Sequence, residues 1–130
     1  MSPRLIPALL LVSTLFAVSI VNADPTLLPH LDTYRDQGVG QASAWRGEEL
    51  WYASYDDRGC TSCHGANPAD IGKHVKTGKS IEPMALSVNP GRYQSAKKIE
   101  KWFLRNCKWT FGRECSLQEK ADILTWLTSQ

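Results

Sequence analysis

The chain has 130 residues with 15 basic and 13 acidic side chains, a length that accommodates one small domain. Because nucleic-acid-binding proteins usually carry a strong basic excess, the formal net charge of +2 argues against a nucleic-acid partner. Five Trp, four Tyr and three Phe give a large aromatic content for this length. A domain this small buries little surface on its own and often needs a further stabilising element.

The first 23 residues have the pattern of a secretory signal peptide. Arg4 supplies a positive charge, residues 5–21 are almost wholly apolar, and small residues precede Asp24. The pattern predicts cleavage between Ala23 and Asp24 and export of a single mature domain, residues 24–130, to the periplasm. The alternative is a retained membrane anchor, but this apolar run contains Pro7 and lies at the short limit for a spanning helix.

The N-terminal half of the mature chain is predicted to hold one helix between irregular segments. Residues 24–41 are polar and rich in turn-forming Pro and Gly. Residues 42–55 are predicted to be helical, because apolar side chains recur at helical spacing at Trp45, Leu50, Trp51 and Tyr55. Gly47 indicates that another helix approaches closely there. Residues 65–91 contain many chain breakers and are predicted to be a long loop.

Two further helices are predicted in the C-terminal part. Ser95 is expected to cap a helix ending near Cys107, with one face formed by Ala96, Ile99, Trp102, Phe103 and Asn106. Ser116 and Glu119 form a capping box that begins a last helix, which ends near Thr128. The apolar stripe of this helix consists of Leu117, Ala121, Leu124 and Leu127. No strand-like alternation is visible, so the predicted fold class is all-α.

Cys60, Cys63 and His64 form the sequence C-x-x-C-H, the attachment motif of a c-type haem. Two cysteines at this spacing reach the two vinyl groups of one porphyrin, and the adjacent histidine then lies beneath the iron. The motif predicts one covalent haem c, which the long loop of residues 65–91 would wrap. A thioredoxin-like redox pair would need a βαβ context, and a zinc site would need a second C-x-x-C pair.

The other two cysteines, Cys107 and Cys115, are expected to form a disulfide, since the chain is predicted to enter an oxidising compartment. The closed loop of about nine residues would contribute about 2.6 kcal/mol by the chain-entropy relation. Two unpaired thiols are the alternative. Net charge is also unevenly distributed, because residues 58–130 hold twelve bases and six acids. This excess steers an acidic partner protein, balances the haem propionates, or is ordinary solvated charge.

The residue opposite His64 decides between an electron carrier and a ligand-binding protein. Met84 is the first candidate, because His/Met ligation is typical of electron-transfer cytochromes c, and gap-filling in an apolar pocket is its alternative role. His74 lies in a basic loop that looks exposed, and nothing favours His30. Asn106 lies on the apolar face of its predicted helix. The residues alone leave the choice between Met84 and Asn106 open.

A set of short segments resembles the SHP-type cytochromes c, which are small, high-spin, asparagine-ligated haem proteins of bacteria. The segments are residues 77–83, 99–102, 105–107 (Arg-Asn-Cys), 112–115 (Gly-Arg-Glu-Cys), 119–122 and 126–127. The resemblance extends from about residue 45 to residue 130. The Arg-Asn-Cys and Gly-Arg-Glu-Cys segments are specific to this family, whereas C-x-x-C-H is shared by all c-type cytochromes.

The resemblance implies a class I cytochrome c fold whose first and last helices cross near Gly47 and Trp126. It implies that the side-chain oxygen of Asn106 is the sixth ligand of ferric iron, beside the disulfide. On reduction this ligand would leave, and oxygen, nitric oxide or carbon monoxide could bind. The partners that it implies are a dihaem c-type cytochrome and a membrane b-type cytochrome.

Three functions follow from these expectations. The first is a redox-gated haem protein that accepts an electron and then binds a diatomic ligand or reduces it. The second is an ordinary electron carrier with His64/Met84 ligation, and the third is a module that stores or senses nitric oxide. No proton donor for an enzymatic reduction can be identified in the sequence, so no catalytic residue is named. A monomer is expected.

Overall fold

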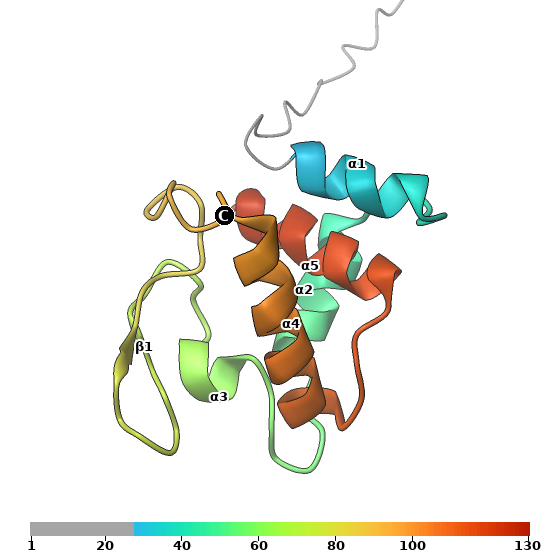
Figure 1. Ribbon diagram of the computed structural model, residues 1–130. Helices are drawn as coiled ribbons and strands as arrows, with labels where there is room; N and C mark the ends of the chain where they lie inside the picture. The colour runs from blue at the N-terminus through green and yellow to red at the C-terminus, as the bar shows by residue number, and fades with distance from the viewer. Residues whose placement is uncertain (1–27) are drawn as a thin grey trace, which may run out of the picture.

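The structure is a computed structural model that describes residues 28–130, so the predicted signal peptide and its cleavage site lie outside the described part. The elements in chain order are α1 (Leu28–Asp36), α2 (Ala44–Tyr52), α3 (Thr61–His64), β1 (Gly72–Lys73), β2 (Ser80–Ile81), α4 (Ala96–Phe111) and α5 (Leu117–Thr128) (Figure 1). The predicted helical fold class is confirmed. None of the helices in residues 28–130 has the length and apolar character needed to cross a bilayer.

The core is built where α2 crosses α5. A Cβ atom at Gly47 would lie 2.1 Å from the carbonyl oxygen of Asp122 and 2.7 Å from Cβ of Trp126. The two backbones can approach this closely only because Gly47 has no side chain. The predicted crossing near Gly47 and Trp126 is therefore confirmed. The largest side chains buried around it are Trp51, Leu124 and Leu127.

Helix α1 was not predicted, since residues 24–41 were expected to form turns. Pro29 is tolerated because it lies in the first helical turn, where its missing N–H breaks no intrahelical bond. The Thr33 hydroxyl donates to the Pro29 carbonyl within this helix. Tyr34 is buried in the core, and Leu31 packs beside it. A helix this short depends on tertiary packing, which local sequence does not reveal.

Other element boundaries also differ from the predictions. Helix α2 ends at Tyr52, so Tyr55 lies outside it, and Trp45 is 65% exposed rather than part of the apolar face. Residues 65–91 include an antiparallel pair of two-residue strands, which is too short to show an alternating pattern. Helix α4 continues one turn beyond Cys107 and ends where Gly112 adopts a left-handed conformation. The Ser116/Glu119 capping box is confirmed.

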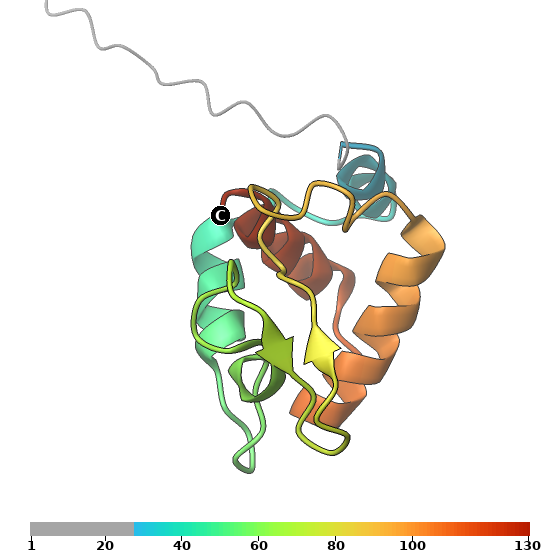
Figure 2. The ribbon, with the colours of Figure 1, turned by 90° about the vertical axis from the view of Figure 1, so that its left-hand side faces the viewer.

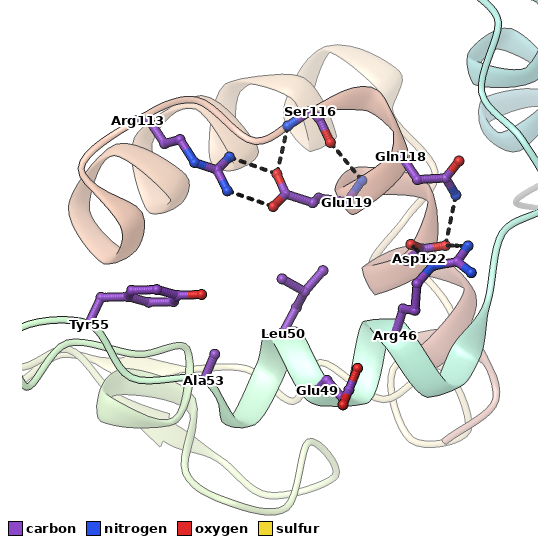
Figure 3. A pocket seen from close by; sticks show the side chains of 10 residues that line it. All are labelled: Arg46, Glu49, Leu50, Ala53, Tyr55, Arg113, Ser116, Gln118, Glu119 and Asp122. Atoms are coloured by element: carbon purple, nitrogen blue, oxygen red, sulfur yellow. Dashed lines mark hydrogen bonds and ion pairs between the residues drawn. The ribbon is translucent and has the colours of Figure 1, made fainter.

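Asp122 ties α2 to α5 beside the crossing. Its side chain is almost fully buried and receives two hydrogen bonds from the Arg46 guanidinium, at 2.7 and 2.9 Å. The side-chain amide of Gln118 also donates to it (Figure 3), as does the backbone N–H of Ser43. Burial alone would raise the pKa of this carboxyl, but the hydrogen bonds from Arg46, Ser43 and Gln118 outweigh it and the pKa is lowered. Asp122 is therefore a buried carboxylate whose negative charge is stabilised by four hydrogen bonds.

Replacing Gly47 by alanine is expected to destabilise the protein by about 1–3 kcal/mol, because the new methyl group overpacks the helix crossing. This loss exceeds the gain of about 1 kcal/mol from the better helix propensity of alanine. Urea unfolding of the holoprotein measures it. Gly91→Ala is the matched control, since a Cβ there meets no atom within 4 Å. Equal unfolding midpoints for the two variants would contradict the close crossing.

The Asp122 ion pair is expected to make stability depend on acid pH. Because the pKa of Asp122 in the folded protein lies below the ordinary value of an aspartate carboxyl, the stabilisation is complete above that ordinary value and is lost as the pH falls through the folded pKa. Asp122→Asn should therefore destabilise the protein most at neutral pH, and the difference should shrink below about pH 4. Asp32→Asn, which breaks an exposed pair with Arg35, is the control and should have little effect. Unfolding curves measured from pH 7 to pH 3 test both.

Candidate functional site

The C-x-x-C-H motif forms a single helical turn, α3, with Cys60 at its N-cap. A short loop joins this turn to the end of α2 (Figure 1). The backbone N–H groups of Cys63 and His64 both donate to the Cys60 carbonyl oxygen, which closes the turn. The Ser62 hydroxyl accepts from the Gly59 N–H and fixes the entry to it. Cys60 and Cys63 are both unpaired thiols and half-buried. The two thiols and the imidazole are therefore carried by one rigid turn.

The core positions His64 through Trp51. The Trp51 ring is buried and lies 5.5 Å from the His64 ring and 5.2 Å from the Trp126 ring, measured between centroids. Its indole Nε1 donates to the Ala66 carbonyl at 3.3 Å, and the Tyr52 hydroxyl donates to the same oxygen. The helix crossing thus holds both the imidazole and the segment that follows it.

Burial sets the protonation of the motif. It lowers the pKa of His64 to about 4, with a smaller contribution from the positive charge of Arg92. The imidazole is therefore neutral at pH 7 and keeps a nitrogen lone pair, the form that binds a metal. Burial also raises the pKa of the Cys60 thiol to about 11. Cys60 is a protonated thiol at neutral pH rather than a reactive thiolate.

The β1–β2 hairpin packs against α3, and Figure 2 shows the two side by side. A Cβ atom at Gly72 would lie 2.4 Å from the Cys63 carbonyl oxygen and 2.9 Å from Cα of His64. Any side chain at Gly72 would push the hairpin away from the motif. The role of Gly72 was not predicted, because one glycine among many chain breakers gives no sign of what it contacts.

Met84 lies in a segment tied to the residues just after the motif. The N–H groups of Met84 and Ala85 both donate to the carbonyl of buried Pro68, at 2.8 and 2.9 Å. The Tyr93 hydroxyl donates to the Met84 carbonyl. The Met84 side chain is half-buried and packs against the hydrophobic core. Its packing fits the gap-filling role considered for it.

Asn106 lies in α4, one residue before a disulfide that joins Cys107 to Cys115 with a Cα–Cα distance of 5.5 Å. Ile99 is buried on this helix, but Asn106 is exposed and Trp102 is 52% exposed, so the predicted apolar face is only partly covered within residues 28–130. Because α4 continues to Phe111, Asn106 is not at the helix end. The Asn106 amide therefore does not cap the end of α4.

The two other histidines have local partners. His74 is exposed, and its Nδ1 accepts the backbone N–H groups of Lys76 and Thr77 at 3.3 Å. The Nε2 atom of His30 lies 3.2 Å from the Tyr93 carbonyl oxygen. Both histidines therefore have structural contacts that account for them.

The residues around the motif fit a covalent haem. The donor set is two unpaired thiols and a neutral imidazole on one turn. Large apolar side chains are exposed elsewhere in the described chain, including Ile71 just before β1 and Trp102 on α4. The zinc alternative needed Cys107 and Cys115, and these are bonded to each other.

A groove of about 640 Å³ lies elsewhere, between α2 and the start of α5 (Figure 3). None of its lining residues belongs to the motif. Arg113 forms two hydrogen bonds with Glu119 on one side, and Arg46 pairs with Asp122 on the other. The members of the Arg46–Asp122 and Arg113–Glu119 pairs in the groove neutralise each other's charge, so the C-x-x-C-H motif remains the candidate site.

The chain is similar in sequence to a family model and to a known cytochrome. A family model described as a domain of unknown function (DUF1924) matches residues 37–127. The chain is 35% identical over 126 residues to the cytochrome c-type protein SHP of Cereibacter sphaeroides, covering 93% of this chain and 97% of that protein.

Two solved structures are also similar. One is oxidised SHP, described as an oxygen-binding cytochrome c, with a TM-score of 0.71 and 38% identity over 77% of this chain and 93% of that chain. The other is cytochrome c'' of Methylophilus methylotrophus, in a study of haem-ligand detachment, with a TM-score of 0.67 and 28% identity over 83% of this chain and 93% of that chain. In both sequence and fold, the chain belongs to the SHP-type cytochromes c.

Proposed function

We propose that this protein is an exported monohaem c-type cytochrome whose second axial ligand leaves on reduction, so that the haem then binds a small ligand such as oxygen, nitric oxide or carbon monoxide. The observation that carries the proposal is that Cys60 and Cys63 are unpaired beside a neutral His64, whereas the other two cysteines form a disulfide next to Asn106. The similar SHP structure is described as an oxygen-binding cytochrome c.

The roles of the motif residues follow from their chemistry. The sulfurs of Cys60 and Cys63 would hold the haem through two thioether bonds, and His64 would provide one nitrogen ligand to its iron. When bound, the haem supplies an iron that changes oxidation state and accepts a small ligand. The Trp51 ring restricts the orientation of the imidazole. Gly72 keeps the hairpin close to the same turn.

Asn106 provides the second axial donor in this proposal. An amide oxygen is a hard, weak donor that suits ferric iron better than ferrous iron, so reduction favours its release. Its exposed side chain on α4 is not buried in a packed contact. The Met84 side chain, by contrast, is half-buried and packs against the hydrophobic core. Ligand detachment is also the subject of the similar cytochrome c'' structure.

The electron comes from another cytochrome, and we propose a dihaem c-type cytochrome or a membrane b-type cytochrome as the donor. The chain acts as a monomer in the periplasm after removal of residues 1–23. The basic excess of residues 58–130 favours a donor with an acidic docking face.

Replacing Cys63 by serine is expected to remove one of the two thioether bonds, because serine has no sulfur to react with a vinyl group. The measurement is the absorption spectrum of the denatured haem in alkaline pyridine, which shifts to longer wavelength for each vinyl group left unsaturated. Thr61→Ser, between the two cysteines, is the control and should give the wild-type spectrum. A wild-type spectrum for Cys63→Ser would contradict covalent attachment at this residue.

The redox-gated site is tested by optical and electron-spin spectra of the holoprotein, oxidised and then reduced with carbon monoxide. The ferrous wild-type protein is expected to be high-spin and to bind carbon monoxide at once. Asn106→Ala should change the ferric spectrum, because the amide ligand is lost. Met84→Leu conserves volume and should leave the spectra unchanged while costing less than about 1.5 kcal/mol of stability.

The opposite result would identify an ordinary electron carrier. The spectra would then be low-spin in both oxidation states, with no response to carbon monoxide. A methionine–ferric charge-transfer band that disappears in Met84→Leu would assign the axial position to Met84 and remove Asn106 from the site.

A further inference from the structure

The arginines of the described chain differ in how their charge is balanced. Four of the six in residues 28–130 pair with a carboxylate: Arg35 with Asp32, Arg46 with Asp122, Arg58 with Asp56, and Arg113 with Glu119. Arg105 is exposed and lies over the Trp102 ring, 5.4 Å from its centroid. Only Arg92 is half-buried and has no carboxylate within 4.0 Å among the described residues.

An arginine without a carboxylate partner in its own chain is free to pair with a carboxylate from a bound group, which its planar guanidinium matches well. The other half-buried arginine, Arg58, has an Nε atom without a partner, but its Nη2 lies 3.5 Å from Asp56. Arg92 is therefore the half-buried arginine whose charge no carboxylate of the described residues balances.

The backbone around Arg92 is held in place. Its N–H donates to the Asn89 carbonyl, and the Asn89 side chain donates to the Pro83 carbonyl at 3.1 Å. The adjacent Tyr93 is buried, its hydroxyl donates to the Met84 carbonyl, and its own carbonyl lies 3.2 Å from His30 Nε2. These bonds close the loop between Pro83 and α4, so Arg92 projects from a fixed point.

This fixed point is close to the motif. The loop that carries Arg92 is joined to the segment after His64 by the two hydrogen bonds that the Met84 and Ala85 N–H groups donate to the Pro68 carbonyl. Arg92 is therefore carried by a loop that is bonded to the chain four residues beyond the motif histidine.

We propose that Arg92 holds a propionate carboxylate of the haem. A haem brings two carboxylates, and the planar guanidinium matches a carboxylate with two parallel hydrogen bonds. The ion pair gives Arg92 its missing counter-charge and orients the porphyrin edge that the two thioether bonds leave free. This assignment rests on the proposed haem at Cys60, Cys63 and His64.

The test uses the holoprotein and the variants Arg92→Gln, Arg92→Lys and Arg105→Gln. Two quantities are measured: the propionate bending band in the resonance Raman spectrum and the midpoint potential at pH 7. Arg92→Gln should shift the band and lower the potential, because loss of a nearby positive charge favours the ferric state. Arg92→Lys should shift the band but keep the potential nearer to wild type, since lysine keeps the charge without the planar fork.

Arg105→Gln is the matched control, because it removes the same charge from an exposed arginine that also lacks a carboxylate partner. It should leave the band unchanged and move the potential less than Arg92→Gln does. An unchanged band in Arg92→Gln would overturn the assignment, whatever the size of the potential shift. If Arg92→Gln does not accumulate as holoprotein, an unchanged band in Arg92→Lys overturns it instead.

The alkaline pyridine spectrum separates this inference from the proposed function. Covalent haem in every variant, together with an unshifted band, rejects only the role of Arg92. Wild-type protein without covalent haem rejects the proposed function and this inference with it.

Discussion

The close crossing of α2 and α5 at Gly47 is the contact on which the rest of the structure depends. Because the Asp122 carbonyl lies where a Cβ of residue 47 would be, the two helices approach to backbone contact. This approach brings the Trp51 and Trp126 rings together inside the core. It also buries the Asp122 carboxylate, which Arg46 neutralises from the other helix. One missing side chain thus sets both the packing and the position of a buried ion pair.

The helix crossing also determines the position of the C-x-x-C-H motif. Trp51 contacts His64 with its ring and the following segment with its indole nitrogen. The motif is a single turn with little packing of its own, so its position is set by the core behind it and by the hairpin that approaches at Gly72. A haem bound there would join two parts of a small protein, the crossed helices and α4, and supply the additional stabilisation that such a domain needs.

Charge is organised around the same site. His64 is neutral because its partial burial lowers the pKa of the imidazole, and Arg92 is the one half-buried arginine without a carboxylate partner in the described chain. The two proposed contacts on the haem therefore differ in kind. In the proposal, Asn106 is a neutral, exposed donor that leaves on reduction, whereas Arg92 is a charged group carried by a hydrogen-bonded loop. With Asn106 as a ligand that leaves and Arg92 as a contact that remains, a coordination position on the iron would become free while the porphyrin kept its position.

The sequence by itself determined the helical class, the Ser116/Glu119 capping box, the haem motif and the glycine at the helix crossing. These are local signals, because spacing along one chain segment decides whether a helix forms or whether two sulfurs reach one porphyrin. Only the tertiary structure decided that residues 28–36 form a helix, that the hairpin packs on Cys63 through Gly72, and that Arg92 lacks a carboxylate partner. Each of these depends on contacts between residues far apart in the chain, and the free energy of such contacts is not encoded in any local pattern.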